Sequence, residues 1–342
     1  MSNKKASIIG WFGQGAFADD LIGAVTEEHF QRLGYETHSK GWPRKNELVK
    51  FMSSFDDIII GGGSIICPTR MHPINTTNIW YPKVKKPLHL FGSGFRKESS
   101  LLSEHEKRLN GYIFSSLSTS WLRGYITEKE LLKNGIKREH DGFGDPGILF
   151  KNTNHLSPNG PSPHLGIVIR NIPEKEIHYS ENRLIHKFFI RFIKKWISVY
   201  KGSVHYISFR HVFPELDCDY FAMSYVKSVI GYENQFLYKP KDYLEAANLI
   251  TSMDHCVSQR LHPTIISLAN NVRCVGLDYQ FRKLEDFSSV VGFDYWHRTD
   301  QLSKETAGKT LDWLSAKDYS KVFCTINTVR EKMKDHLKKT FG

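Results

Sequence analysis

Short apolar runs alternate with longer amphipathic segments along this chain, and the alternation predicts βαβ units with mostly parallel sheets. Two of the strands in the first half run directly into glycines at their carboxyl ends, where open α/β sheets bind ligands. In this half the pattern predicts strands at residues 7–10, 57–60, 87–91 and 111–115, and helices at 20–33, 98–109 and 128–134.

A polar segment rich in turn-forming residues, 151–163, separates this series from a second one and is expected to link two domains. The predicted boundaries are 1–155 for the first domain and 164–310 for the second, followed over 311–342 by basic helices that could pack back on the first. The second series predicts strands at 165–170, 204–208, 255–257 and 273–277, helices at 181–200, 243–251 and 263–269, and a basic helical tail at 318–339.

The predicted helix at 181–200 has apolar residues along one side and Lys187, Arg191, Lys194 and Lys195 on the other. A basic face of this kind could contact a membrane surface. The favoured interpretation is an outer helix that docks on its sheet and turns a solvated face to water.

The net charge and the cysteine content of the chain indicate what kind of partner and which compartment to expect. The 342 residues include 47 Lys and Arg against 36 Asp and Glu, and the net charge of +11 indicates an anionic partner. The five cysteines form no C-x-x-C pair, which argues against a disulfide framework or a zinc site and favours a reducing cytoplasm.

No apolar run approaches the ~18 residues that span a bilayer. Lys4 and Lys5 before an apolar stretch imitate a signal peptide, but Gln14 and nearby glycines favour a strand that enters a glycine-rich turn. A cytoplasmic location is expected, with weak association at the inner face of the membrane left open.

Two glycine-rich loops are candidate binding elements. The loop 13–20, which contains Gly15, would aim backbone N–H groups and a helix start at an anion. Asp19 and Asp20 end this loop, and we expect one to cap the helix and the other to face a cleft. After the second predicted strand, Gly62, Gly63 and Ser64 permit a close approach of another group, although a tight turn is the simpler interpretation.

The segment Ser258 to Pro263 is the most specific, because Arg260 and His262 lie between a short strand and a predicted helix that Pro263 could open. In an extended segment the two side chains would project to the same side, so the arginine could hold an anion while the histidine handles a proton. Three further cations, Arg123, Arg170 and Lys283, follow other predicted strands and could reach the same cleft.

The segments 13–20, 58–64, 123–127, 166–170 and 258–283, together with Asp145-Pro146, resemble the polysaccharide pyruvyl transferase family in order and spacing over about residues 6–290. The resemblance implies two Rossmann-like domains in a GT-B-type arrangement that face an interdomain cleft. It also implies transfer of pyruvate from phosphoenolpyruvate onto two hydroxyls of a sugar as a ketal. The chain departs from the family's usual first loop at Ala16 and Ala18, and has Gly124 where an acidic residue is usual.

On this interpretation Arg123, Arg260 and Lys283 would hold the carboxylate and phosphate of the donor, without a metal or other cofactor. His262 would be the acid or the partner of the leaving phosphate, because histidine exchanges a proton near neutral pH. Asp19 or Asp20 would accept a proton from the acceptor hydroxyl, and the sequence does not choose between them.

Two other classes stay open at this point. A GT-B glycosyltransferase would bind a nucleotide sugar in place of phosphoenolpyruvate, and a non-catalytic relative would bind a saccharide without chemistry. Nucleic acid is not an expected partner, because the positive charge is spread along the chain and no nucleic-acid motif occurs. The acceptor saccharide, free or lipid-linked, and the oligomeric state are not determined by the sequence.

Overall fold

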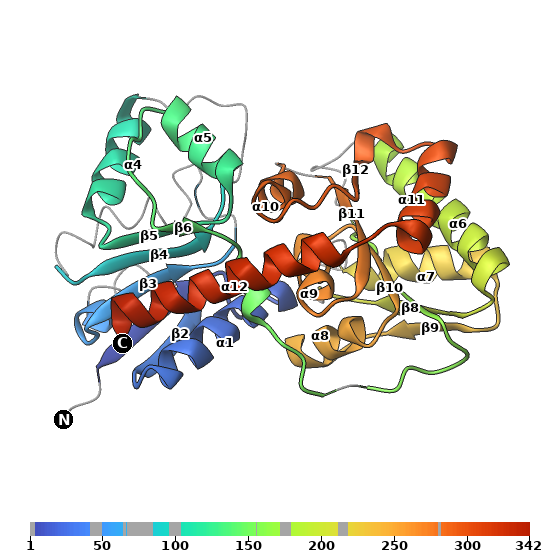
Figure 1. The fold of residues 1–342 in the computed structure, drawn as a ribbon, viewed down its shortest axis with the longest axis horizontal. Helices are drawn as coiled ribbons and strands as arrows, with labels where there is room; N and C mark the ends of the chain where they lie inside the picture. Colours follow the sequence, from blue (N-terminus) through green and yellow to red (C-terminus); the bar gives the residue numbers. More distant parts are fainter. Residues whose placement is uncertain are drawn as a thin grey trace.

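The computed structural model describes residues 4–41, 50–63, 66, 85–95, 104–154, 156–171, 179–210, 218–279 and 282–342. These residues form two α/β halves, each built on a parallel six-stranded sheet (Figure 1). The two-domain α/β fold predicted from the alternation of apolar and amphipathic segments is thereby confirmed.

The first sheet has the order β2-β1-β3-β4-β5-β6, so the chain starts in an inner strand and crosses over in both directions. Ile58, Ile59 and Ile60 of its third strand are at most 1% exposed, as expected for a parallel strand covered on both faces. The elements are β1 (Lys5–Gly10), α1 (Phe17–Arg32), β2 (Glu36–Gly41), β3 (Asp57–Gly61), β4 (Leu88–Ser93), α4 (Glu104–Ser116), β5 (Thr119–Leu122), α5 (Tyr125–Lys133), β6 (Gly142–Phe143) and η1 (Pro146–Leu149).

The second sheet has the order β12-β11-β10-β7-β8-β9. Its outer layer includes α6, which docks through a row of buried aromatic residues that includes Phe188, Phe192 and Trp196. The elements are β7 (His164–Val168), α6 (Tyr179–Tyr200), β8 (Ser203–Ile207), α7 (Asp219–Ile230), β9 (Gln235–Tyr238), α8 (Tyr243–Thr251), β10 (His255–Ser258), α9 (Leu261–Ala269), β11 (Arg273–Asp278), α10 (Lys283–Val291), β12 (Trp296–Arg298), η3 (Thr299–Gln301) and α11 (Lys304–Ala316).

The last helix, α12 (Ser320–Phe341), runs across both halves and joins them (Figure 1). Near its middle the Arg330 guanidinium donates to the carbonyl oxygens of Ile148, at 2.6 Å, and of Ala269. At its end the Phe341 ring lies 4.6 Å from the ring of Phe30 in α1. The carboxyl-terminal helix therefore returns from the second half to the first.

Two predicted elements differ from the structure. Residues 111–115 were expected to form a strand, but they belong to the end of α4, and the strand β5 begins only at Thr119. Three consecutive apolar residues fit a buried helix end as well as a strand, so periodicity could not separate the two. The helix α9 starts at Leu261, which places Pro263 third in the helix and not first.

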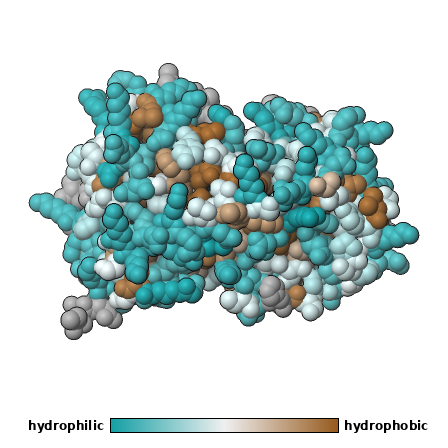
Figure 2. Space-filling model, in the orientation of Figure 1, coloured by the Kyte–Doolittle hydropathy of each residue, from teal (hydrophilic) through white to brown (hydrophobic). Residues whose placement is uncertain are grey.

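The surface in the orientation of Figure 1 is mostly hydrophilic, and a notch at its upper edge separates the two halves (Figure 2). No helix within the described ranges is long and apolar enough to cross a bilayer.

Candidate active site between the two halves

The carboxyl ends of the two sheets meet through the loop that follows β1. Ala16 of this loop forms an antiparallel bridge with Arg210, which follows β8 in the other half. The amide of Phe17 donates to the carbonyl oxygen of Phe209 at 3.2 Å. The first turn of α1 is thus attached by backbone hydrogen bonds to the second half of the molecule.

Asp20 holds the glycine loop together. Its Oδ1 accepts a hydrogen bond of 2.6 Å from the amide of Gly13. Gly13 and Gly15 have φ of +70° and +67°, in the left-handed region that glycine enters without strain. The expectation that one aspartate caps α1 is wrong, because the N-cap is Ala16 and no side chain caps it.

Asp19 faces the other half of the molecule. Burial raises the pKa of its carboxyl group, while electrostatic interactions with His262, Lys283 and Arg210 lower it and reduce the net shift. All three of these residues lie in the second half. Asp19 is therefore a carboxyl group of the first half that interacts with two basic residues and one histidine of the second.

Gly62 and Gly63 follow β3, and a side chain at either position would meet a different neighbour. A Cβ on Gly62 would lie 2.3 Å from Cγ2 of Ile22, so this residue lets α1 pack closely on the loop. A Cβ on Gly63 would lie 3.3 Å from Oδ1 of Asp19, so this turn borders the site. Both residues have positive φ. Ser64 lies outside the described residues.

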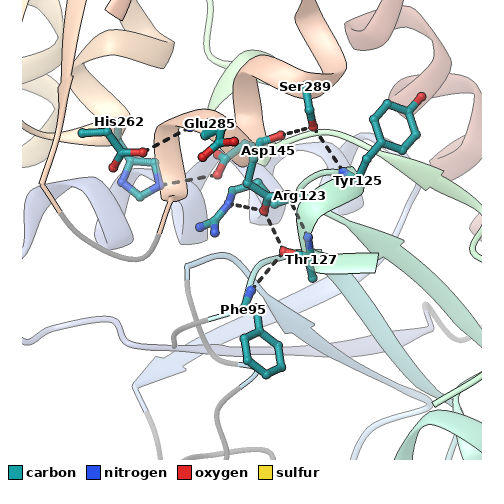
Figure 3. A network of polar contacts seen from close by, with 10 residues as sticks. Phe95, Arg123, Tyr125, Thr127, Asp145, His262, Glu285 and Ser289 are labelled. Atoms are coloured by element: carbon teal, nitrogen blue, oxygen red, sulfur yellow. Dashed lines mark hydrogen bonds and ion pairs between the residues drawn. The ribbon is translucent and has the colours of Figure 1, made fainter. Parts of the chain in front are cut away.

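His262 of α9 points toward Asp145, which follows β6 in the first half (Figure 3). The distance between Nε2 of His262 and Oδ2 of Asp145 is 3.7 Å. The other oxygen of Asp145 accepts a hydrogen bond of 2.9 Å from the amide of Gly147, which fixes the carboxylate. Nε2 and Oδ2 are both buried and have no hydrogen-bond partner among the described residues. The pair therefore joins the two halves while retaining unused hydrogen-bonding capacity.

The guanidinium of Arg260 binds a carboxylate of the protein, whereas the sequence predicted that it would bind the donor. Arg260 is the N-cap residue of α9 and has an extended backbone, but His262 already lies in the helix, so strand alternation does not place the two side chains on one side. Its guanidinium binds both carboxylate oxygens of the buried Asp219, with a distance of 2.7 Å from Nε to Oδ2. The edge of the guanidinium that carries Nε and Nη2 is therefore engaged by Asp219, and donor binding by Arg260 stays a prediction.

Arg123 lies in a buried contact between the halves and is only 1% exposed. Its Nε donates to Oδ2 of Asp286 in α10 at 3.1 Å. Asp286 also accepts from the amide and hydroxyl of Thr127, at 2.9 and 2.6 Å (Figure 3). A Cβ on Gly124 would lie 2.0 Å from the carbonyl oxygen of Asp286, so glycine is needed for this approach. Arg123 therefore lies in the contact between the halves, and its contact with substrate stays a prediction.

Arg170 and Lys283 complete the predicted set. Nη1 of Arg170 donates to the hydroxyl of Tyr279 at 2.7 Å, and its guanidinium lies 4.9 Å from the centre of that ring. Lys283 begins α10 and acts electrostatically on Asp19. Arg170 contributes positive charge at Arg260.

Within the described ranges, no group of three or more His, Cys, Asp or Glu residues is arranged to hold a metal ion.

Four important residues were absent from the predicted site: Asp145, Arg210, Asp219 and Asp286. Asp145 and Arg210 do carry a sequence signal, because each follows a strand at its carboxyl end, as the predicted residues do. Asp219 and Asp286 lie in helices and are recognised only through their partners.

The two facing sheets and the helix that returns to the first half define a protein with a GT-B-like fold. Similar solved structures include a putative UDP-N-acetylglucosamine 2-epimerase from Listeria monocytogenes, with 12% identity, a TM-score of 0.62, and coverage of 99% of this chain and 98% of that one. A glycosyltransferase from Rickettsia africae has 9% identity, a TM-score of 0.61, and coverage of 100% and 98%. The UDP-GlcNAc 2-epimerase of Methanocaldococcus jannaschii has 12% identity, a TM-score of 0.60, and coverage of 99% and 100%. At these identities the likeness concerns the fold.

The sequence profile of the polysaccharide pyruvyl transferase family matches residues 19–280. The chain therefore belongs to this family, as the resemblance implied, and is a transferase of polysaccharide biosynthesis. A search of the curated proteins finds no match.

Proposed function

We propose that this protein transfers the pyruvyl group of phosphoenolpyruvate onto two hydroxyls of a sugar and forms a cyclic ketal. The observation that carries the proposal is the meeting of Asp19 and Asp145 from one half with His262, Lys283 and Arg210 from the other. This arrangement offers a base, an acid and fixed positive charge at one junction.

In the proposal, Lys283 and Arg210 bind the phosphate and carboxylate of the donor. Both already act on the carboxylate of Asp19, so their charges reach the place where a substrate anion would bind. Arg170 and Arg260 add positive charge to the second half, while Arg260 keeps α9 in position through Asp219. The charge requirement of the donor is then met by side chains.

The reaction proceeds in two additions. His262, protonated, gives its proton to the methylene carbon of the donor, while a sugar hydroxyl attacks the adjacent carbon and gives its proton to Asp19. The carbon–oxygen bond to phosphate then breaks. The second hydroxyl attacks the same carbon and gives its proton to His262, which restores the acid, while the proton held by Asp19 passes to the departing phosphate; a ketal and inorganic phosphate remain. The raised pKa of Asp19 makes it a stronger base than an exposed aspartate.

Asp145 would act as a positioning residue for His262. A carboxylate beside an imidazole stabilises its protonated form and fixes the orientation of the ring. Because Asp145 and His262 belong to different halves, the acid is positioned only when the halves are together. The acceptor saccharide, free or lipid-linked, would approach between them.

The test is calorimetric binding of phosphoenolpyruvate in the presence of a chelator. We expect binding by the wild-type protein and at least tenfold weaker binding by Lys283→Ala, because a charge-assisted contact to the anion is lost. Lys332→Ala, at an exposed position on α12, is the matched control and should bind as the wild type does.

The competing function is a glycosyl transfer from a nucleotide sugar, which the fold alone does not separate from pyruvyl transfer. Binding of UDP-sugars with no binding of phosphoenolpyruvate would overturn the proposal. Equal donor affinity in Lys283→Ala and Lys332→Ala would remove Lys283 from the donor site.

A further inference from the structure

The outer face of α7 has an uncovered apolar stripe. Phe221, Tyr225 and Val229 are 47%, 53% and 42% exposed. They are spaced four residues apart and therefore share one side of the helix. The opposite side of α7 is buried through residues such as Met223 and Val226. The stripe is thus additional to the residues that fix the helix to its sheet.

A row of basic residues lies beside this stripe on α6. The ring of His186 in α6 is 5.4 Å from the ring of Tyr225, so the two helices touch at this point. Arg183, three residues before His186, lies on the same side of α6 and is exposed. Lys187 and Lys194 are exposed next to this side. The apolar stripe and the basic row therefore form one continuous surface, the α6–α7 face.

Charge is strongly segregated on this face. Residues 182–200 and 220–230 contain no Asp or Glu, although the whole chain has 36. The same two segments contain Arg183, Lys187, Lys194 and Lys227, whereas Arg191 and Lys195 lie on the side of α6 toward Glu305 and Gly308 of α11. A face that served only for solubility would be expected to mix both signs of charge.

We propose that the α6–α7 face docks on an anionic lipid bilayer. Aromatic and aliphatic side chains on one stripe enter the interface between headgroups and acyl chains, while lysine and arginine beside them bind anionic headgroups. A nucleic acid would satisfy the charges but would leave the apolar stripe uncovered. The bilayer accounts for both parts of the surface.

Docking in this orientation would bring the start of α9, which carries His262, close to the bilayer. The helix α7 begins at Asp219, whose carboxylate holds Arg260 at the start of α9, and Phe221 follows two residues later. A lipid-linked acceptor could then reach His262 without leaving the membrane. This consequence rests on the proposed function, whereas the docking itself does not.

The experiment is flotation of the full-length protein with vesicles of phosphatidylglycerol and phosphatidylcholine, and separately with phosphatidylcholine alone. We expect binding to the anionic vesicles only, with weakening as salt increases. The double variant Phe221→Ser/Tyr225→Ser should bind roughly tenfold more weakly or worse, because the inserted side chains are lost. Lys187→Glu/Lys194→Glu should also lose binding.

The matched control is Tyr112→Ser/Leu132→Ser, which removes two side chains of similar exposure from α4 and α5 in the other half. This control should float as the wild type does. Equal binding by the control and by Phe221→Ser/Tyr225→Ser would overturn the proposal, as would complete displacement of the protein from vesicles by RNA. Flotation needs no substrate, so its outcome is independent of the proposed reaction.

Discussion

The two halves of the molecule meet at two groups of charged residues, and these groups differ in how fully their polar atoms are hydrogen-bonded. Around Asp286, both carboxylate oxygens are engaged by Arg123 and Thr127. Around His262 and Asp145, two buried atoms face each other at 3.7 Å and have no hydrogen-bond partner among the described residues.

The difference separates structure from function. A buried charge that is fully paired contributes to holding the halves together, and its loss leaves the partner uncompensated. A buried polar pair whose atoms lack hydrogen-bond partners lowers stability unless another group bonds to those atoms. A substrate or a transferred proton can take that role. Substitution of Asp286 should therefore lower mainly stability, whereas substitution of His262 or Asp145 should lower mainly turnover.

The largest expected effect is on stability, in Asp286→Ala. The substitution removes the carboxylate from the buried Arg123, and we expect the free energy of unfolding to fall by about 3–5 kcal/mol. Denaturation in urea measures it. Glu285→Ala is the control, because the Glu285–Arg282 pair is partly exposed and should change stability by at most about 1 kcal/mol. Similar losses in both variants would show that Asp286 does not join the halves.

The largest effect on turnover is expected in His262→Gln. Loss of general acid catalysis should lower turnover by ~10²–10⁴-fold, while calorimetry should show nearly unchanged donor affinity. His38→Gln, which alters an exposed histidine in β2, should keep the wild-type rate. Wild-type turnover in His262→Gln would exclude it as the acid.

Asp145→Asn should have a smaller effect on turnover. The amide can still accept from Gly147, but it no longer stabilises a positive charge on His262. Loss of the carboxylate that positions the acid should lower turnover about 10–100-fold, which corresponds to about 1.4–2.7 kcal/mol in the activation free energy. Wild-type turnover in Asp145→Asn would mean that Asp145 is only a part of the scaffold.

Asp20→Ala should mainly affect stability. The variant lacks the acceptor for the amide of Gly13, and this loss should cost about 1 kcal/mol of unfolding free energy. Its turnover per folded molecule should stay closer to the wild-type value than that of Asp19→Ala. The reverse order in turnover would exchange the roles of the two aspartates.

The smallest stability effect is expected in Asp19→Asn, and its sign depends on pH. Because the folded-state pKa of Asp19 is raised above 3.8, the folded protein holds this proton more tightly than the unfolded chain does. Asp19 therefore lowers stability as pH rises from about 4 through its folded pKa. At neutral pH, Asn should be at least as stable as Asp, although the variant lacks the base. Thermal unfolding from pH 4 to 7 measures the difference, and a variant less stable at pH 7 than at pH 4 relative to wild type would contradict it.

The fold could be predicted from the sequence because the alternation of apolar runs reflects which residues are buried. This pattern is visible within each short stretch of the chain. It also predicted that Asp19, His262 and Lys283 come from one junction, since all three follow parallel strands at their carboxyl ends. That placement is a general property of α/β sheets and needs no knowledge of side-chain contacts.

The pairing of charges could not be predicted in the same way. Asp286 lies 163 residues from Arg123, and Asp219 lies 41 residues from Arg260. Nothing local distinguishes an arginine that binds substrate from one that binds a distant carboxylate. The spacing of Arg260 and His262 was misleading because the helix α9 begins between them, and strand alternation ends there.

The most direct test of pyruvyl transfer is the mass of the product formed from phosphoenolpyruvate and a panel of acceptor saccharides, measured together with released phosphate. We expect an acceptor heavier by one pyruvate less one water, with one phosphate released for each ketal, and loss of both signals in His262→Gln. Transfer of a sugar from a nucleotide sugar, with no phosphate released from phosphoenolpyruvate by any acceptor, would contradict it.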